Sequence, residues 1–267
     1  MITSADNQKV KEARALLERR GREQQGRSLA EGVRLIEDAM RAGVVPALLF
    51  SAARSSLAER ARSLVERAQG EGIPAYEVSA AVLATLSDTV TSQGVIAVLP
   101  LPRHTTPGLP SGLTLVLDKV RDPGNLGTIL RSAEAAGAEQ VMLTPGCVDP
   151  WSPKVMRAGM GAHFRLRMLA DQGWESIRRS MGSRAIWLAD AHGEIPYDEV
   201  DWRQPCAVAV GGETEGFDSE ALVLSDGRVA IPMDGDADSL NAAMAATVLL
   251  FEAARQRREG KQRCTKG

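Results

Sequence analysis

The chain has 267 residues, of which 44% are hydrophobic and 25% charged, and its formal net charge is −2. This composition provides enough apolar material for a folded core and excludes wholesale disorder. The near-neutral balance excludes a protein-wide positive field, although residues 253–267 carry a net charge of +5 and residues 1–34 a net charge of +3. Basic ends fit contact with phosphate groups at particular places, but on charge alone solvent-exposed helix faces are the simpler explanation.

The cysteines and histidines are scattered along the chain. They are Cys147, Cys206, Cys264, His104, His163 and His192. None has the spacing of metal ligands or of a disulfide framework, so we expect no metal. The N-terminus lacks the features of a signal peptide, and no apolar run approaches the roughly 20 residues of a membrane span. We therefore expect a cytoplasmic protein.

The first hundred residues alternate between helical and strand patterns. Helices are predicted over residues 7–20, 31–42, 57–68 and 81–86, and strands over residues 44–50, 75–78 and 94–99. About 100 residues of this kind form a small α/β domain of ordinary size.

A proline-rich segment follows. Residues 100–112 contain four prolines, which fix the backbone and disfavour helix. We therefore divide the chain into a first domain at residues 1–100, a linker at 101–112 and a second domain at 113–267.

The second domain begins with a strand at residues 113–117 whose side chains are mostly apolar, as in a strand buried on both faces of a parallel sheet. Further strands are predicted at residues 140–143, 185–189, 206–210 and 229–231. Helices fit between them, and a long helix is predicted from residue 240 to about residue 257. Ligands bind at the carboxyl ends of such strands, so the loops there are the candidate site.

The first candidate loop, residues 118–131, leaves a strand and enters a helix at Asn125, a residue suited to capping. Gly127 leaves the first helical turn open to close approach, and Arg131 lies nearly two turns later. An ordinary capped helix with an exposed arginine explains this loop equally well.

The second candidate loop, residues 210–217, has glycines at Gly211, Gly212 and Gly216, which let the backbone approach a ligand. Glu213 adds a carboxylate at the mouth of the sheet. The dinucleotide-binding pattern Gly-x-Gly-x-x-Gly is absent, which disfavours a generic nucleotide-binding protein.

The third candidate loop runs from Ile231 to a helix rich in alanine. Ser239 is a candidate N-cap for that helix, and the alanines at residues 242–246 permit close packing against another helix or a subunit. A sequence that simply forms helix well gives the same pattern.

In their order and spacing, the three loops resemble the motifs of the SpoU/TrmH family of RNA methyltransferases over residues 113–258. The matching patterns are Asn125-x-Gly-x-x-x-Arg131, Gly211-x-Glu213-x-x-Gly216, and Ile231-Pro-Met with Ser239-Leu-Asn241. The first domain resembles the substrate-binding domain of family members that act on ribosomal RNA.

The resemblance implies an α/β fold: a C-terminal parallel-sheet methyltransferase domain tied in a trefoil knot near residues 210–245, with a smaller N-terminal α/β RNA-binding domain. Such a knot is an exception to the rule that chains do not thread loops. Family members are obligate homodimers, and we expect the alanine-rich face of residues 242–254 to contact the partner.

The resemblance also implies residue roles. S-adenosylmethionine would be held by Thr144, Gly211, Gly212, Gly216, Ile231, Met233 and Leu240, and catalysis would involve Arg131, Asn125, Glu213, Ser239 and Asn241. Local positive charge assigns RNA contact to Lys154, Arg157, Arg165 and Arg167.

The residue types fit methyl transfer to a ribose 2′-hydroxyl. Because arginine keeps its proton in proteins, Arg131 is expected to stabilise developing alkoxide charge and not to act as a base. The sequence departs from the family at Gly212, where asparagine is usual, at Thr214, where glycine is common, and at Ala243, where a hydroxyl is lost. These departures bear on the details of the site.

The expected substrate is 23S ribosomal RNA. Three alternatives stay open within the same resemblance: a methyltransferase that confers antibiotic resistance by modifying ribosomal RNA, a transfer RNA 2′-O-methyltransferase, and a non-catalytic RNA-binding homologue.

Overall fold

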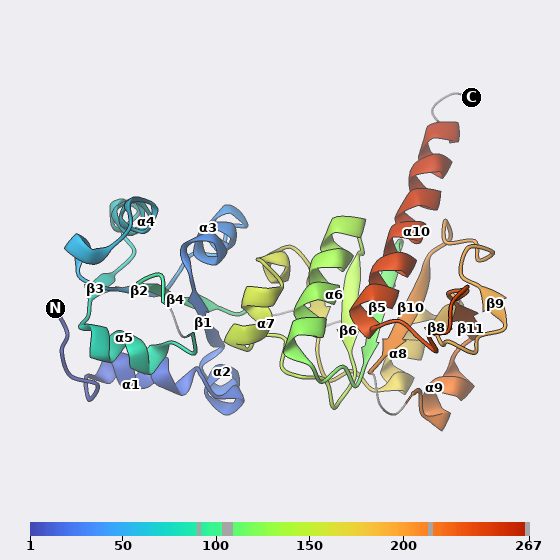
Figure 1. Ribbon diagram of the computed structural model, residues 1–267, viewed down its shortest axis with the longest axis horizontal. Coiled ribbons are helices and arrows are strands. Elements are labelled where there is room, and N and C mark those ends of the chain that lie inside the picture. Colours follow the sequence, from blue (N-terminus) through green and yellow to red (C-terminus); the bar gives the residue numbers. More distant parts are fainter. Residues whose placement is uncertain (90–91, 103–108, 213–215, 265–267) are drawn as a thin grey trace. The chain divides into compact units, whose positions relative to one another are not determined.

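The computed structural model describes residues 1–89, 92–102, 109–212 and 216–264, the last four by their backbone alone. The chain folds into two compact units (Figure 1). Unit 1 comprises Met1–Arg103 and Asp149–Phe164, and unit 2 comprises His104–Val148 and Arg165–Gly267.

Unit 1 is built on a four-stranded sheet with the order β1-β4-β2-β3, in which β4 is antiparallel to both neighbours. Its strands are β1 (Arg27–Glu31), β2 (Leu48–Ser51), β3 (Ala75–Glu77) and β4 (Val95–Pro100). Its helices are α1 (Gln8–Ala15), α2 (Arg19–Gln25), α3 (Val33–Arg41), α4 (Glu59–Gly70), α5 (Ala80–Leu86) and α7 (Pro153–Ala158), with short 3-10 turns at Arg54–Ser56 and Ala162–Phe164.

Both faces of this sheet are covered, because β4 is apolar throughout Val95–Leu99 and buries side chains on each side. One core cluster joins the sheet to α3 and α4, and a second joins it to α1 and α5. Strand β1 was missed by the sequence prediction, which began a helix at residue 31. Gly32, with φ of 103°, separates the strand from α3.

Residues 149–164 come from the middle of the predicted second domain, yet they pack within unit 1. Met156 is fully buried in the core beside α3 and α4, with Trp151 and Phe164 against it. The buried guanidinium of Arg22 donates to Asp149 at 2.8 Å, and the Ser28 hydroxyl donates to the Trp151 carbonyl at 2.7 Å. Long-range contacts of this kind leave no local pattern, so the sequence does not predict that this segment packs with the first hundred residues.

Unit 2 contains a seven-stranded parallel sheet with the order β7-β6-β5-β10-β8-β11-β9. Its strands are β5 (Leu113–Asp118), β6 (Gln140–Leu143), β7 (Arg167–Leu169), β8 (Ile186–Ala189), β9 (Ile195–Pro196), β10 (Cys206–Gly211) and β11 (Gly227–Ala230). Its helices are α6 (Pro123–Ala136), α8 (Trp174–Met181), α9 (Ser219–Leu224) and α10 (Ala242–Cys264). The expected α/β fold is confirmed, and the two short strands β7 and β9 are additions to it.

Helices cover the two faces of this sheet differently (Figure 1). Helices α8 and α9 pack on one face through a cluster that includes Trp174, Ile177 and Ala221. Helices α6 and α10 pack against each other, and α10 also packs on β10. The expected trefoil knot near residues 210–245 stays a prediction.

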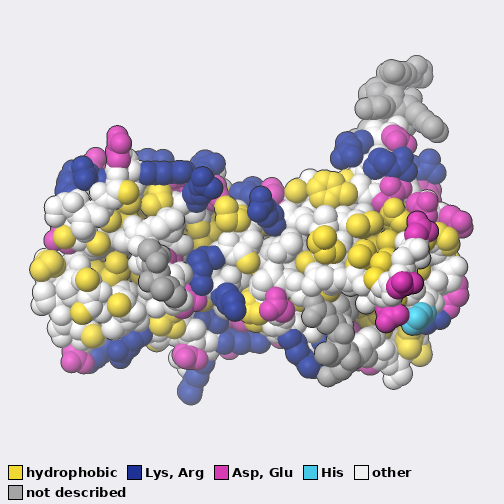
Figure 2. Space-filling model, in the orientation of Figure 1, with side chains coloured by type: hydrophobic (Ala, Val, Ile, Leu, Met, Phe, Trp, Pro, Cys, Tyr) yellow, Lys and Arg dark blue, Asp and Glu magenta, His cyan; other side chains and the backbone are white. Residues whose placement is uncertain are grey.

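The alanines of α10 face the interior of their own chain, contrary to the expected interface. Ala243, Ala246 and Ala253 are buried within the protomer, while Met244 and Phe251 are 60% and 44% exposed. Hydrophobic side chains lie exposed on the face of unit 2 over which α6 and α10 run (Figure 2). The small residues of α10 let it approach α6 closely. Its larger apolar side chains, Met244 and Phe251, lie on its exposed face.

Candidate active site

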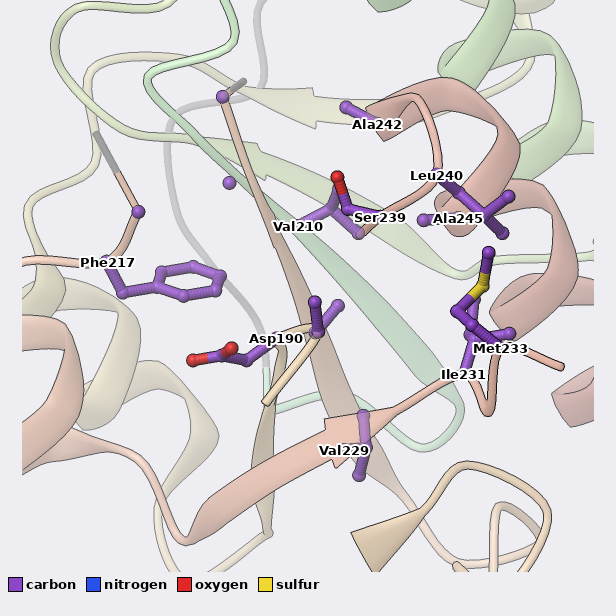
Figure 3. A pocket seen from close by; sticks show the side chains of 15 residues that line it. Asp190, Val210, Phe217, Val229, Ile231, Met233, Ser239, Leu240, Ala242 and Ala245 are labelled. Atoms are coloured by element: carbon purple, nitrogen blue, oxygen red, sulfur yellow. The ribbon is translucent and has the colours of Figure 1, made fainter. Parts of the chain in front are cut away.

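The loops that follow β8, β10 and β11 enclose a cavity of about 290 Å³ (Figure 3). The carboxyl ends of these neighbouring parallel strands lie at one edge of the sheet, which is where ligands bind in such folds. Six of the seven residues predicted to hold a methyl donor line this cavity. They are Gly211, Gly212, Gly216, Ile231, Met233 and Leu240.

The cavity has an apolar side and a mixed side (Figure 3). Ile231, Met233 and Leu240 lie together on the apolar side, and Asp190 and Phe217 lie on the other. Such a lining suits a ligand that combines a flat aromatic ring with charged and hydroxyl groups.

The lining was predicted only in part, because Asp190 and Phe217 were not expected. Asp190 follows strand β8 directly, and that position at a strand's carboxyl end was the available signal. Its Oδ1 accepts the backbone N–H of His192 at 2.8 Å, and its Oδ2 lies 3.4 Å from the guanidinium of Arg228.

Gly211 and Gly212 differ in how much space their surroundings leave for a side chain. A Cβ on Gly212 would lie 2.5 Å from the carbonyl oxygen of Lys119, so a side chain cannot be accommodated without a shift of backbone. A Cβ on Gly211 would meet only the ring of Phe217 at 3.6 Å, an ordinary contact. In this chain a side chain at Gly212 would therefore require the backbone at Lys119 to move, whereas the missing side chain at Gly211 leaves the cavity open.

The two asparagines of the predicted site meet across α6 and α10. The Asn241 Nδ2 donates to the Asn125 Oδ1 at 3.1 Å. The Asn241 Oδ1 accepts the backbone N–H of Ala243 at 2.9 Å, so Asn241 caps α10 and its amide is held in a defined orientation.

Two predicted caps are wrong. Helix α6 begins earlier than expected, at Pro123, and the carboxylate of Asp122 caps it by accepting the N–H of Asn125 at 2.7 Å. Helix α10 begins at Ala242, after Ser239, which lines the cavity instead of capping. In both cases a neighbouring side chain with the same capping ability caps the helix. The Asn125 side chain is instead bonded to Asn241, and Ser239 lines the cavity.

Arg131 lies on α6, six residues after Asn125, which is about 9 Å along the helix axis. Its side chain is exposed. Among the residues that the structure describes, the Arg131 side chain makes no hydrogen bond or ion pair, so its guanidinium is available to an external partner.

Thr144 does not line the cavity, although the sequence assigned it to the donor site. It is buried, and its hydroxyl donates to the carboxylate of Asp118 at 2.7 Å. Glu213, the remaining predicted catalytic residue, lies outside the described residues.

The four residues predicted to contact RNA lie in different units. Lys154 and Arg157 are in α7 of unit 1, and Arg165 and Arg167 are in unit 2. Lys154 is exposed, whereas the Arg157 Nη2 donates to Asp88 at 2.9 Å and the Arg165 Nε donates to Glu134 at 2.8 Å. Two of the four positive charges are thus partly neutralised within the protein.

The described residues were also expected to hold no metal site and no membrane span. Within residues 1–89, 92–102, 109–212 and 216–264, no group of three or more His, Cys, Asp or Glu side chains is placed to hold a metal ion. In the same part of the chain, no helix combines the length and the hydropathy needed to cross a membrane.

Comparison with known proteins covers both units. A model described as the SpoU rRNA Methylase family matches residues 112–251, and a model described as the MRM3-like substrate binding domain matches residues 7–97. The chain is 36% identical to human mitochondrial rRNA methyltransferase 3, over 89% of this chain and 69% of the relative.

Two bacterial proteins are similar over nearly their whole length. One is RlmP of Bacillus subtilis, a 23S rRNA (guanosine(2553)-2′-O)-methyltransferase, which is 30% identical over 94% of this chain and 97% of its own. The other is the solved structure of the SpoU methyltransferase AviRb from Streptomyces viridochromogenes with the cofactor AdoMet. It superposes with a TM-score of 0.84 at 31% identity, over 94% of this chain and 98% of that one.

Proposed function

The chain belongs to the SpoU rRNA methylase family, and from this we propose that it transfers a methyl group from S-adenosylmethionine to a ribose 2′-hydroxyl of 23S ribosomal RNA. The observation that supports the proposal most is the cavity. It gathers the glycine loop after β10 and the loop before α10 at one sheet edge, beside the paired asparagines of α6 and α10.

The cavity fits the methyl donor. S-adenosylmethionine supplies a methyl group on a positively charged sulfur. The apolar side chains of Ile231, Met233 and Leu240 suit its adenine ring, and the absent side chains at Gly211 and Gly216 leave room for contact with the backbone. The half-buried Asp190 carboxylate is suited to hydroxyl or ammonium groups.

The acceptor chemistry falls to residues on α6 and at the start of α10. A ribose hydroxyl is a poor nucleophile and must lose its proton during attack. Arg131 provides a fixed positive charge for the developing alkoxide, and its planar fork can also hold an RNA phosphate. Asn125 and Asn241, fixed by their mutual hydrogen bond and the α10 cap, orient the reacting groups, with Ser239 and Glu213 as further members of the site.

We further propose that the protein acts as a homodimer. Support comes from the exposed Met244 and Phe251, which lie seven residues apart on α10 and so share one face of the helix. Exposed apolar side chains that share one face of a helix are typical of an interaction surface.

Lys154, Arg157, Arg165 and Arg167 are proposed to contact RNA phosphates, and Lys154 has the most available charge of the four. A cytoplasmic location belongs to the same proposal. The relatives' names include a bacterial 23S rRNA enzyme and a mitochondrial one, and ribosomal RNA occurs in both settings.

Donor binding can be tested without RNA by calorimetric titration with S-adenosylhomocysteine. Gly211→Val should weaken binding at least tenfold, because its side chain enters the cavity while the fold tolerates a Cβ there. Gly173→Val is the matched control, since a Cβ at Gly173 meets nothing within 4 Å and the residue lies outside the cavity. Equal affinity in wild type and Gly211→Val would place the donor elsewhere.

A further inference from the structure

Asp118 is a buried carboxylate that the catalytic scheme above does not use. It ends strand β5 next to Gly211 of β10 and is 1% exposed. Its Oδ1 accepts the hydroxyl of Thr144 at 2.7 Å. Its Oδ2 makes no hydrogen bond of normal geometry with any described residue, although the indole of Trp174 faces the same carboxylate.

Through Thr144, this carboxylate controls the backbone of the next residue. The Thr144 Oγ1 accepts the backbone N–H of Lys119 at 3.1 Å while donating its own proton to Asp118. Lys119 has φ of 54°, the left-handed conformation that a residue with a Cβ adopts only when its surroundings enforce it. Its ammonium also donates to Asp218 at 2.9 Å. Asp218 follows the loop after β10, whose described residues we call the donor loop: Gly211, Gly212, Gly216 and Phe217.

The same turn fits against the donor loop. The carbonyl oxygen of Asp118 accepts the N–H of Gly212 at 2.8 Å. The carbonyl of Lys119 occupies the space that a side chain on Gly212 would need. The position of the donor loop therefore depends on the conformation of the turn.

The turn also sets where α6 begins. Three residues after Lys119, the carboxylate of Asp122 caps the helix that carries Asn125 and Arg131. One backbone reversal at residues 118–122 thus fixes both the loop that lines the cavity and the helix that bears the acceptor-side residues.

We propose that Asp118 is a positioning residue for methyl transfer: by orienting Thr144, its carboxylate holds the turn at residues 118–122 and so aligns the donor loop with α6. This inference rests on the proposed function.

Stability alone does not account for a carboxylate at this position. Burial raises the pKa of Asp118 above its ordinary value, although Thr144 and Lys119 oppose the shift, and Asp218 adds to it. Cys147 packs beside the same groups, and its own pKa is raised by burial. Because the ionised form is disfavoured in the fold, an uncharged residue of the same shape would be at least as stable at neutral pH.

The test compares Asp118→Leu, Thr144→Val and Thr144→Ser with a buried polar control pair at the opposite end of the same two strands. There Gln140 donates to the Thr114 hydroxyl at 3.1 Å, so Thr114→Val removes an equivalent bond between β5 and β6 far from the turn. The readouts are the single-turnover methylation rate on 23S ribosomal RNA at saturating donor, the affinity for S-adenosylhomocysteine, and the thermal midpoint at pH 7.

We expect Asp118→Leu, which has a similar shape but cannot accept the Thr144 hydroxyl, to lower the single-turnover rate at least tenfold without lowering the midpoint. Thr144→Val should lower the rate similarly and weaken S-adenosylhomocysteine binding several-fold, and Thr144→Ser should restore both. Thr114→Val should lower the midpoint and leave the rate unchanged.

The inference is overturned if Asp118→Leu keeps the wild-type rate, or if it lowers the midpoint as much as Thr114→Val does, since its loss of rate would then report instability. Those outcomes leave the proposed function intact, because wild type still methylates RNA. A wild-type protein that transfers no methyl group to ribosomal RNA would overturn the proposed function itself.

Discussion

Single residues carry different parts of the proposed chemistry: Arg131 supplies the fixed charge on the acceptor side, and Asn125 on the same helix is held by Asn241. The type of Arg131 and its spacing from Asn125 could be predicted from the sequence because both lie on one helix. Two other residues were not predicted correctly. Thr144 was expected in the donor site but donates to Asp118, and Asp190 was not expected in the cavity. A local pattern identifies residues on one element, whereas contacts between strand ends depend on the order of strands in the sheet.

Arg131→Ala should lower the single-turnover methylation rate by about 10²–10³-fold, because one charge-stabilising group is lost from the transition state. Arg131→Lys should recover little, since an ammonium cannot reproduce the planar fork. Affinity for S-adenosylhomocysteine, measured by calorimetry, should stay near that of wild type.

Arg179→Ala, an exposed arginine on α8, is the matched control and should keep the wild-type rate. If Arg131→Ala and Arg179→Ala were equally active, the catalytic assignment of Arg131 would be wrong even with the family membership intact.

At the scale of elements, strands β5, β6 and β10 were predicted closely because their apolar runs are buried on both faces of a parallel sheet. The starts of α6 and α10 were not, since each offers two side chains able to cap and only the folded chain selects one. The packing of segment 149–164 within unit 1 was not predicted for a related reason: its partners, Arg22 and Ser28, are more than 120 residues away.

His163 makes the stability of the segment 149–164 depend on pH. Its ring is fully buried, its Nε2 donates to the Pro150 carbonyl at 2.8 Å, and burial lowers its pKa from 6.5 to about 4. The neutral ring therefore contributes stability that is complete above pH 6.5 and is lost as the pH falls toward 4.

Urea unfolding should show this loss, which amounts to about 2 kcal/mol of unfolding free energy between pH 7 and pH 5. In His163→Gln, which keeps a donor for Pro150 but does not titrate, that part of the pH dependence should disappear. His192→Gln, at an exposed position, should retain it. The same pH slope in wild type and His163→Gln would refute the assignment.

At the scale of the whole molecule, residues 149–164 pack within unit 1, so cutting the chain near residue 100 does not separate the two units. Deletion of residues 1–100 would uncover Trp151, Met156 and Phe164, so loss of activity in such a truncation would report misfolding as much as loss of RNA contact. RNA docking is better probed in the full chain. The proposed dimer likewise needs the full chain, because it rests on the outer face of α10.

Light scattering at micromolar concentration should give wild type a mass of twice the 28.5 kDa of one chain. Phe251→Glu should shift the protein toward the monomer, because a charge is placed in the apolar stripe with Met244. Val223→Glu places the same charge at an exposed apolar position on α9 and should leave the dimer intact. A monomeric wild type would contradict the proposed homodimer.

The central claim is methyl transfer to a ribose hydroxyl of 23S ribosomal RNA, and mass spectrometry of the product tests it most directly. Unmodified 23S ribosomal RNA is incubated with the full chain and S-adenosylmethionine, digested to nucleosides, and compared with reactions that contain Arg131→Ala or transfer RNA. We predict one 2′-O-methylated nucleoside, formed by wild type on ribosomal RNA and strongly reduced in Arg131→Ala. A methylated base, a product only on transfer RNA, or no product from wild type would contradict the account.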